Sequence, residues 1–363
     1  MNVQVEERFQ ISPFFVFYLV HAGVIGLGIL SYQRSLVQAA SYDSWVSILL
    51  LGLVMNGVIW MMYRMLNSEQ NDLHSLHEWL FGKWIGKGLT LVFSLYLFYA
   101  SFMILIGYLE IVKVWLFPTL KPWLLQMVIL LLVYYILSGG LRMITGICLW
   151  GVIIPLAMIG PLLVYPIQFG QWSNLQPILN HSLMEYVHSG KLMIFQYVGF
   201  ESLFFYFPFI KKGGQSLKWA QWGMISVILL YLVNMFITFV YYSEGLLQHT
   251  IWPTLTMITI LEVPFIQRFE YIMVSIWLLV VIPNICIYLW SAARGVKRAF
   301  NWKMKFTFIP AIILLYLSAI FIKERQMISM MGEILSWMGM VSMAYIAVLY
   351  VMVSMKRAWS KKT

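Results

Sequence analysis

A carboxylate lies in the middle of a strongly apolar stretch of the chain. Glu201 falls about halfway along segment 192–210, two residues after Gly199, where its side chain cannot easily reach the membrane surface. It could bind a substrate ammonium group or carry a coupling proton; the alternative is a carboxyl group bonded to neighbouring helices. Tyr197 and Phe200 complete this candidate site, with Phe200 as a lid or pocket wall, or else as lipid-facing bulk.

A second candidate site lies in the first apolar segment. Gly23, Gly26 and Gly28 fall within six residues, and each glycine costs a helix roughly 1 kcal/mol relative to Ala. An unwound backbone here, including Val24 and Ile25, would offer N–H groups and a half-helix dipole to a substrate carboxylate. The alternative is that the glycines only let another helix pack closely.

Three further polar positions could line a pathway. Glu110 lies late in the third apolar segment, where a local ion pair with Lys113 competes with a pathway role. Tyr96 and Tyr99 precede it and could line an aqueous route, although tyrosine is also a common packing residue. Asn284 follows a proline, which frees a backbone carbonyl that a ligand, water or ion could use.

Composition identifies an integral membrane protein, and the sequence offers no set of catalytic or metal-binding residues. The 363 residues are 61% hydrophobic and 10% charged. Cys148 and Cys286 are too few for a disulfide framework or a metal site. His74 and His77 could share a metal, but a solvated amphipathic helix explains them better. No catalytic triad or phosphate-binding loop is present in the sequence, so we expect neither an enzyme, nor a cofactor, nor a metal site.

The chain reads as one transmembrane domain over residues 1–363 with about ten helices. A spanning helix needs about 20 predominantly apolar residues. The segments are roughly 11–31, 45–66, 89–115, 122–138, 144–166, 191–210, 219–243, 271–292, 306–322 and 333–355.

Basic residues set the expected orientation. With the N-terminus in the cytoplasm, seventeen of the 24 Lys and Arg residues fall on the inside. The formal net charge of +10 is therefore explained by membrane topology, and nucleic-acid binding is not expected. We expect a multi-pass protein in a lipid bilayer with both termini cytoplasmic.

The two interrupted segments divide the chain into halves. They are the first and the sixth of the ten, so each begins a group of five, about 11–166 and about 191–355. Because five is odd, the second group crosses the membrane in the opposite sense. This predicts an all-α, five-plus-five inverted repeat with discontinuous helices 1 and 6 around a central site.

These residues resemble a known family. The runs Gly23–Leu30 and Gly199–Ser202 look like the unwound segments of the amino acid/polyamine/organocation transporter superfamily. Three further runs, Ala40–Ser47, Tyr206–Lys212 and Val263–Glu270, resemble the spore germination permeases, which are the B-type subunits of nutrient germinant receptors. The resemblance covers essentially the whole chain. His21 is a departure, because it is not part of the motif, and it leaves the contour of the pocket open.

The resemblance implies a sensor in the inner membrane of the spore. It implies assembly with A-type and C-type receptor subunits, recognition of a small germinant, commonly an amino acid, and signalling that triggers germination. The alternative is a proton-coupled amino acid uptake permease of the same fold.

Overall fold

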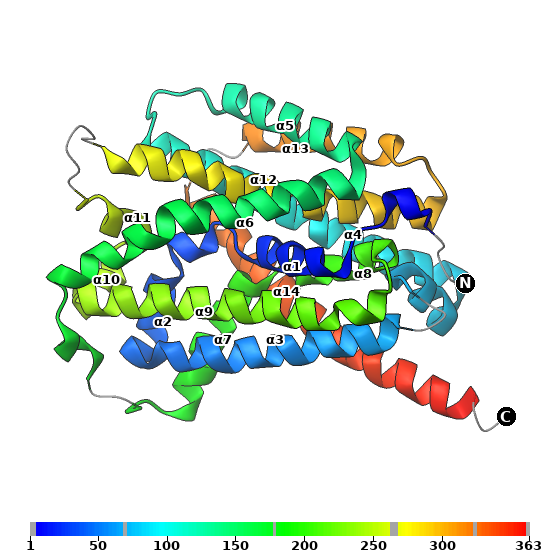
Figure 1. The fold of residues 1–363 in the computed structure, drawn as a ribbon, viewed down its shortest axis with the longest axis horizontal. Helices are drawn as coiled ribbons and strands as arrows, with labels where there is room; N and C mark the ends of the chain where they lie inside the picture. The colour runs from blue at the N-terminus through cyan, green and yellow to red at the C-terminus, as the bar shows by residue number, and fades with distance from the viewer. Residues whose placement is uncertain (1–4, 68–70, 177–178, 262–267, 322–324, 361–363) are drawn as a thin grey trace.

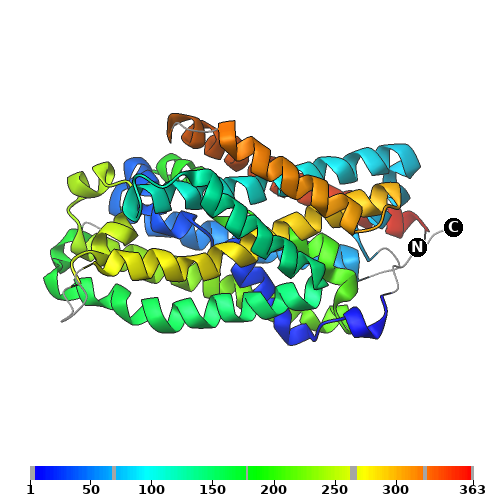
Figure 2. The same cartoon turned by 90° about the horizontal axis from the view of Figure 1, so that it is seen from above.

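The structure is a bundle of helices that run roughly along one axis (Figures 1 and 2). It is a computed structural model, and it describes residues 5–67, 71–176, 179–261, 268–321 and 325–360. The motif positions 263–267 lie outside the described residues. Within the described ranges, the helices are α1 (Val16–Val24), α2 (Tyr32–Ala40), α3 (Trp45–Leu66), α4 (Leu73–Trp115), α5 (Pro122–Ser138), α6 (Gly140–Val164), α7 (Leu183–Tyr197), α8 (Leu203–Tyr206), α9 (Leu217–Tyr241), α10 (Glu244–His249), α11 (Pro253–Ile258), α12 (Phe269–Phe300), α13 (Lys305–Phe321) and α14 (Arg325–Ser360).

Several of these helices are long and apolar enough to cross a bilayer. Among the described residues, six pass on length and hydropathy, and the pair Leu183–Tyr197 and Phe200–Phe209 forms a seventh that is bent by 49°. Pro13–Val24, Pro122–Ser138 and Lys305–Ser318 are apolar but shorter. The predicted number of ten spans therefore stays a prediction.

The outside of the bundle is apolar, as a lipid-facing surface requires. Large hydrophobic side chains are exposed along several helices rather than in one patch, which a soluble protein of this size would not tolerate. Examples on α3, α5 and α14 are Leu50, Leu53, Val54, Val128, Leu131, Tyr135, Trp337, Val341 and Val348.

Both sequence glycine motifs coincide with breaks in helices. α1 ends at Val24, earlier than the predicted end near residue 31, and after the break the chain forms the short η3 turn (Gly28–Leu30) and then α2, which ends at Ala40. Hydropathy missed α2 because its sequence, YQRSLVQAA, is largely polar. α7 begins at Leu183 rather than near residue 191, since Ser182 and Glu185 form a capping box at its N-terminus.

The end of the bundle that holds the chain termini is closed by polar contacts. The η1 turn (Glu7–Phe9) and the end of α14 lie there, on the right in Figure 1. Arg357 on α14 donates to the carbonyl oxygen of Arg64 at 2.9 Å. Both side chains are predicted to be cytoplasmic, so the structure places them at one end of the bundle as expected.

An ion pair joins α4 to α12 at this end. Asp72 caps α4 by accepting from the Ser75 N–H at 2.8 Å, and Arg298 Nε lies 2.6 Å from its other oxygen. Burial raises the pKa of Asp72, but the charge of Arg298 and the hydrogen bonds from Ser75 outweigh burial, so the pKa is lowered overall. Asp72 is therefore an ionised group that fastens two central helices.

The histidines next to this ion pair are buried rather than solvated. The expectation of a solvated surface helix is wrong, because α4 folds back at Gly82 (φ 78°) and packs its first turns against the bundle. His77 contacts Thr90 at 3.1 Å and Tyr345 on α14 at 3.0 Å. This segment is an amphipathic helix, as predicted, but its histidine side chains contact protein groups and not solvent.

Candidate functional site

The two broken segments meet in the middle of the bundle. Gly199 has φ 118°, a conformation that favours glycine, and a Cβ there would lie 2.1 Å from the Gly23 carbonyl oxygen and 2.1 Å from the Tyr288 hydroxyl. Tyr288 on α12 donates its hydroxyl to the Gly23 carbonyl and also lies 3.0 Å from the Val198 carbonyl. One side chain therefore holds backbone groups that both breaks set free.

A second α12 side chain holds the first break. Asn284 is fully buried, and its Nδ2 donates to the carbonyl oxygens of Ala22 and of Ile25, the latter at 2.7 Å. The carbonyl of Val280, one turn earlier on α12, lies 3.2 Å away. Asn284 and Tyr288 are four residues apart, so they share one face of α12.

A small space, the front cavity, lies against both breaks. It has a volume of about 20 Å³. Its wall includes Val24, Gly26, Leu27, Gly28, Ala100, Ile104, Phe195, Gln196, Val198, Asn284, Tyr288 and Leu335. Two buried acceptors, Gln196 Oε1 and Asn284 Oδ1, find no hydrogen-bond partner in the part of the chain that the structure describes. Because unpaired buried acceptors are costly, a ligand with N–H or O–H donors would stabilise this wall.

The front cavity continues into a larger vestibule. The vestibule has a volume of about 660 Å³, and residues of α2, α4, α7 and α14 line it. Of these helices, α2 lies at the end of the bundle away from the chain termini (Figure 1). The two spaces share part of their walls, including Gly28 and Gln196. Glu110 and Arg325 pair across the vestibule wall at 3.3 Å, and Arg325 lies 4.5 Å from the ring centre of Trp252. The described ion pair of Glu110 is thus with α14 and not with Lys113.

Glu201 lies behind the second break and is fully buried. Its carboxylate accepts from the Gly199 N–H at 2.7 Å, from the Tyr96 hydroxyl at 2.8 Å and from the Ser342 hydroxyl at 3.2 Å. These donors come from the break, α4 and α14. Glu201 therefore connects the break to two long helices, and it is not among the residues of the front-cavity wall.

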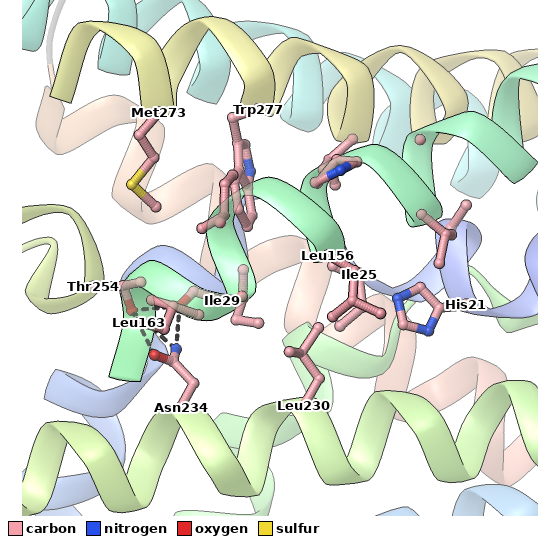
Figure 3. Close-up of a pocket in the computed structure, with 17 residues that line it drawn as sticks. His21, Ile25, Ile29, Leu156, Leu163, Leu230, Asn234, Thr254, Met273 and Trp277 are labelled. Atoms are coloured by element: carbon pink, nitrogen blue, oxygen red, sulfur yellow. Dashed lines mark hydrogen bonds between the residues drawn. The ribbon is translucent and has the colours of Figure 1, made fainter. Parts of the chain in front are cut away.

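Another space, the back cavity, lies on the other side of the first break (Figure 3). It has a volume of about 50 Å³ and lies between α1, α6, α9 and α12. The side chains of Asn234 and Thr254 both donate to the Ile29 carbonyl, at 3.1 and 3.0 Å, and so bind the far end of the break. His21 lies 2.7 Å from the Ser226 hydroxyl on α9. Most of the wall is apolar, so this space fits helix packing better than recognition of a polar ligand.

The predicted site residues thus divide into groups. Val24, Gly26, Gly28 and Asn284 line the front cavity, while Ile25 faces the back cavity and offers only its carbonyl to Asn284. Gly23 and Gly199 form the crossing of the breaks.

The predicted aromatic residues lie outside the front-cavity wall. Phe200 is buried, so it is not lipid-facing bulk. Tyr197 donates to the Ile48 carbonyl at 3.1 Å, and Tyr99 donates to the Met331 carbonyl at 2.8 Å. The Tyr96 hydroxyl donates to the Glu201 carboxylate.

Sequence reasoning missed several groups that the structure brings to the site. Tyr288 could have been found, because it is one helical turn after Asn284 on a helix with a polar central face. Gln196 stands in the interrupted segment beside Tyr197 and has the only amide there. Ser342 and Arg325 carried no signal, since nothing in their own segments relates them to a distant carboxylate. Among the described residues, no group of three or more His, Cys, Asp or Glu side chains could hold a metal ion.

Comparison with known proteins identifies relatives along the whole chain. The family model described as spore germination protein matches residues 10–328. The spore germination protein GerQB of Bacillus cereus is 35% identical over 345 residues, which cover 95% of each chain. The spore germination protein A2 of Bacillus subtilis (strain 168) is 24% identical over 350 residues, which cover 93% of this chain and 94% of the relative.

Solved structures resemble the fold. A Na⁺-coupled sialic acid symporter, in a substrate-bound outward-open state, has a TM-score of 0.72 at 12% identity over 94% of this chain and 78% of its own. MhsT in complex with L-phenylalanine has a TM-score of 0.62 at 14% identity, over 99% of this chain and 90% of its own. At these identities the likeness shows the fold alone, and it confirms the predicted all-α membrane fold of inverted repeats with broken helices.

Proposed function

Because the chain belongs to the spore germination protein family, we propose that it is the membrane subunit of a nutrient germinant receptor. It binds a small germinant, most simply an amino acid, and its response triggers germination. Its partners are the A-type and C-type receptor subunits, and its location is the inner membrane of the spore, with both termini in the cytoplasm.

The observation that carries this proposal is the front cavity with its two unpartnered acceptors. Gln196 and Asn284 both line this cavity, which shares part of its wall with the vestibule. Ammonium N–H groups match such acceptors, and the backbone around Gly26 and Gly28 can take a carboxylate at the start of the second half-helix. An amino acid offers both groups. A ligand larger than the present space would extend into the vestibule.

Binding becomes a signal if the ligand favours one arrangement of the broken helices over another. A ligand can shift such an equilibrium only through its differential affinity for the two states. In this proposal Glu201 and Tyr96 hold the second break in its ligand-ready arrangement. Glu110 lies in the vestibule wall and adjusts access to the cavity, whereas Tyr99 is in the wall of neither space.

Filling the front cavity tests the proposal. A Cβ at Gly26 would lie 3.1 Å from Ile104 Cδ1 and 3.2 Å from Asn284 Oδ1, so Gly26→Val places two methyl groups in the ligand space. Gly57→Val is the matched control, because a Cβ there meets nothing within 4 Å. We expect Gly26→Val spores to contain normal amounts of the protein and to lose their nutrient response, while Gly57→Val spores respond normally.

The measurements are germination against a nutrient panel and binding of the same nutrients to the purified protein. Germination through an agent that bypasses the receptor shows that the spores are intact. An unchanged dose–response of abundant Gly26→Val protein would contradict a ligand site in the front cavity.

A second function is favoured by one observation, namely that a solved structure of similar fold is a symporter. Proton-coupled uptake of amino acids would need the same cavity. Uptake of radiolabelled amino acid into proteoliposomes under a pH gradient distinguishes the two functions. Binding without accumulation supports the sensor, and accumulation that collapses with the gradient supports the permease.

A further inference from the structure

The contact between α12 and the first break has an unusual composition. Three backbone carbonyl oxygens, those of Ala22, Ile25 and Val280, surround a single nitrogen, Asn284 Nδ2. All four residues are buried. An amide nitrogen carries two hydrogens, so the acceptors here outnumber the protons available to them.

The orientation of the amide follows from these neighbours. If the side chain were turned over, Oδ1 would face three carbonyl oxygens and every contact would be repulsive. The observed orientation instead places Oδ1 at the front cavity, 3.2 Å from the Cβ position of Gly26. The side chain therefore presents its positive edge to the break and its negative edge to the ligand space.

A cluster of converging carbonyls is also what a hard cation requires. Backbone carbonyls can replace the hydration shell of an alkali ion, and in transporters with broken helices the unwound carbonyls coordinate the coupling ion. Here the broken helix and α12 supply such carbonyls, and the partial positive charge of an amide occupies their centre.

We propose that Asn284 Nδ2 takes the place of a coupling cation between the first break and α12, so that the protein keeps its broken helix in the binding arrangement without Na⁺. A side chain that is covalently attached to α12 cannot dissociate. The contact is therefore permanent. This suits a receptor that must be able to bind its ligand at any ion concentration around it. This inference concerns the ion requirement, and it does not depend on which germinant the cavity takes.

The test compares thermal unfolding of the full-length protein in nanodiscs in NaCl and in N-methyl-D-glucamine chloride of equal ionic strength. We expect the wild-type Tm to be the same in both salts. Asn284→Asp puts a carboxylate oxygen among the three carbonyls, so this variant should have a lower Tm in N-methyl-D-glucamine. Added Na⁺ should raise its Tm along a saturating curve, as a bound ligand does.

Asn234→Asp is the matched control. Asn234 is a fully buried asparagine that also donates to the first broken segment, but to one backbone carbonyl, that of Ile29, and to the Thr254 hydroxyl. We expect it to lose stability with no saturable recovery in Na⁺. A saturable rise of the wild-type Tm with Na⁺ would overturn the proposal, and so would equal responses of the two aspartate variants. If Asn284→Asp does not fold in either salt, the wild-type comparison alone decides.

Discussion

Glu201→Gln separates the two roles that a buried carboxyl group could play here. The change preserves the shape of the side chain but removes its ability to carry a charge. A carboxylate can accept on both oxygens, and Glu201 does so, from the Gly199 N–H on one side and from Tyr96 and Ser342 on the other. A glutamine has one oxygen and one NH₂ group. Its oxygen should turn to Gly199, because a backbone N–H cannot reorient, whereas the two hydroxyls can rotate and accept.

The structural cost of this change is therefore small. One net hydrogen bond is lost or weakened, which costs about 0.5–1.5 kcal/mol of the free energy of unfolding. The functional cost is larger if the charge holds the second break in its ligand-ready arrangement, because a hydrogen bond to a charged group contributes about 1.5–3 kcal/mol. Since 1.4 kcal/mol corresponds to tenfold, the half-maximal nutrient concentration should rise about 10- to 100-fold.

The assay is a nutrient dose–response of spores, with quantification of the protein and of the proposed partner subunits in the spore membrane fraction. Ser342→Ala is the control, because it removes the longest of these hydrogen bonds and leaves the carboxyl group in place. We expect Ser342→Ala to shift the midpoint less than Glu201→Gln does, because the carboxylate keeps its charge and the hydrogen bonds from Gly199 and Tyr96. A wild-type midpoint for Glu201→Gln at normal abundance would refute the reasoning and leave Glu201 as a bond between helices.

Two further predictions concern stability, and thermal unfolding of the purified protein checks both. Gly199→Ala should lower the free energy of unfolding by about 2–6 kcal/mol, because of backbone strain at φ 118° and overpacking against the first break. The control Gly57→Ala should be neutral or should stabilise its helix by up to about 1 kcal/mol. Equal effects of the two substitutions would contradict the close crossing of the breaks. Asp72→Asn keeps a capping side chain but loses the charge that Arg298 binds, at a cost of about 1.5–3 kcal/mol. The pKa of Asp72 is lowered in the folded state, so this stabilisation is present above the ordinary aspartate pKa of about 4 and is lost as the pH falls toward the folded-state value. The difference in free energy of unfolding between wild type and variant should therefore be constant near neutral pH and shrink in acid.

The positions of the two breaks could be predicted from sequence because their cause is local. Glycines and a carboxylate inside apolar segments conflict with a continuous helix in lipid wherever the rest of the chain lies. Gly199 shows this most directly, since its φ of 118° and the nearby Gly23 carbonyl both require the absence of a side chain. The pairing of these breaks followed from their equivalent places in the two halves of the chain.

The partners of the polar groups could not be predicted, because they come from segments far apart in sequence. Glu110 has a lysine three residues away, yet its described ion pair is with Arg325. His77 belongs to an amphipathic pattern that a surface helix would also show, and only the fold places Tyr345 beside it. The extent of α2 was missed for a related reason: its polar residues bond to other helices, as Gln33 does to Thr254 at 2.7 Å, and hydropathy does not record such contacts.

The central role of α12 has a consequence for how a ligand could produce a signal. Asn284 binds the first break, while Tyr288 binds both breaks, so α12 is attached to freed carbonyls on both sides of the crossing. Any rearrangement of the breaks relative to α12 must exchange these hydrogen bonds, and each one left unmade in a buried site costs about 1–3 kcal/mol. A ligand that bonds to Asn284 Oδ1 and Gln196 Oε1 in only one arrangement supplies an energy of the same size. Arg298 lies near the other end of α12, on the same helix, and pairs with Asp72 at the start of α4. A shift of α12 that begins at the front cavity would therefore be felt at the end of the bundle where the chain termini lie, which is where a partner subunit on that side of the membrane could detect it.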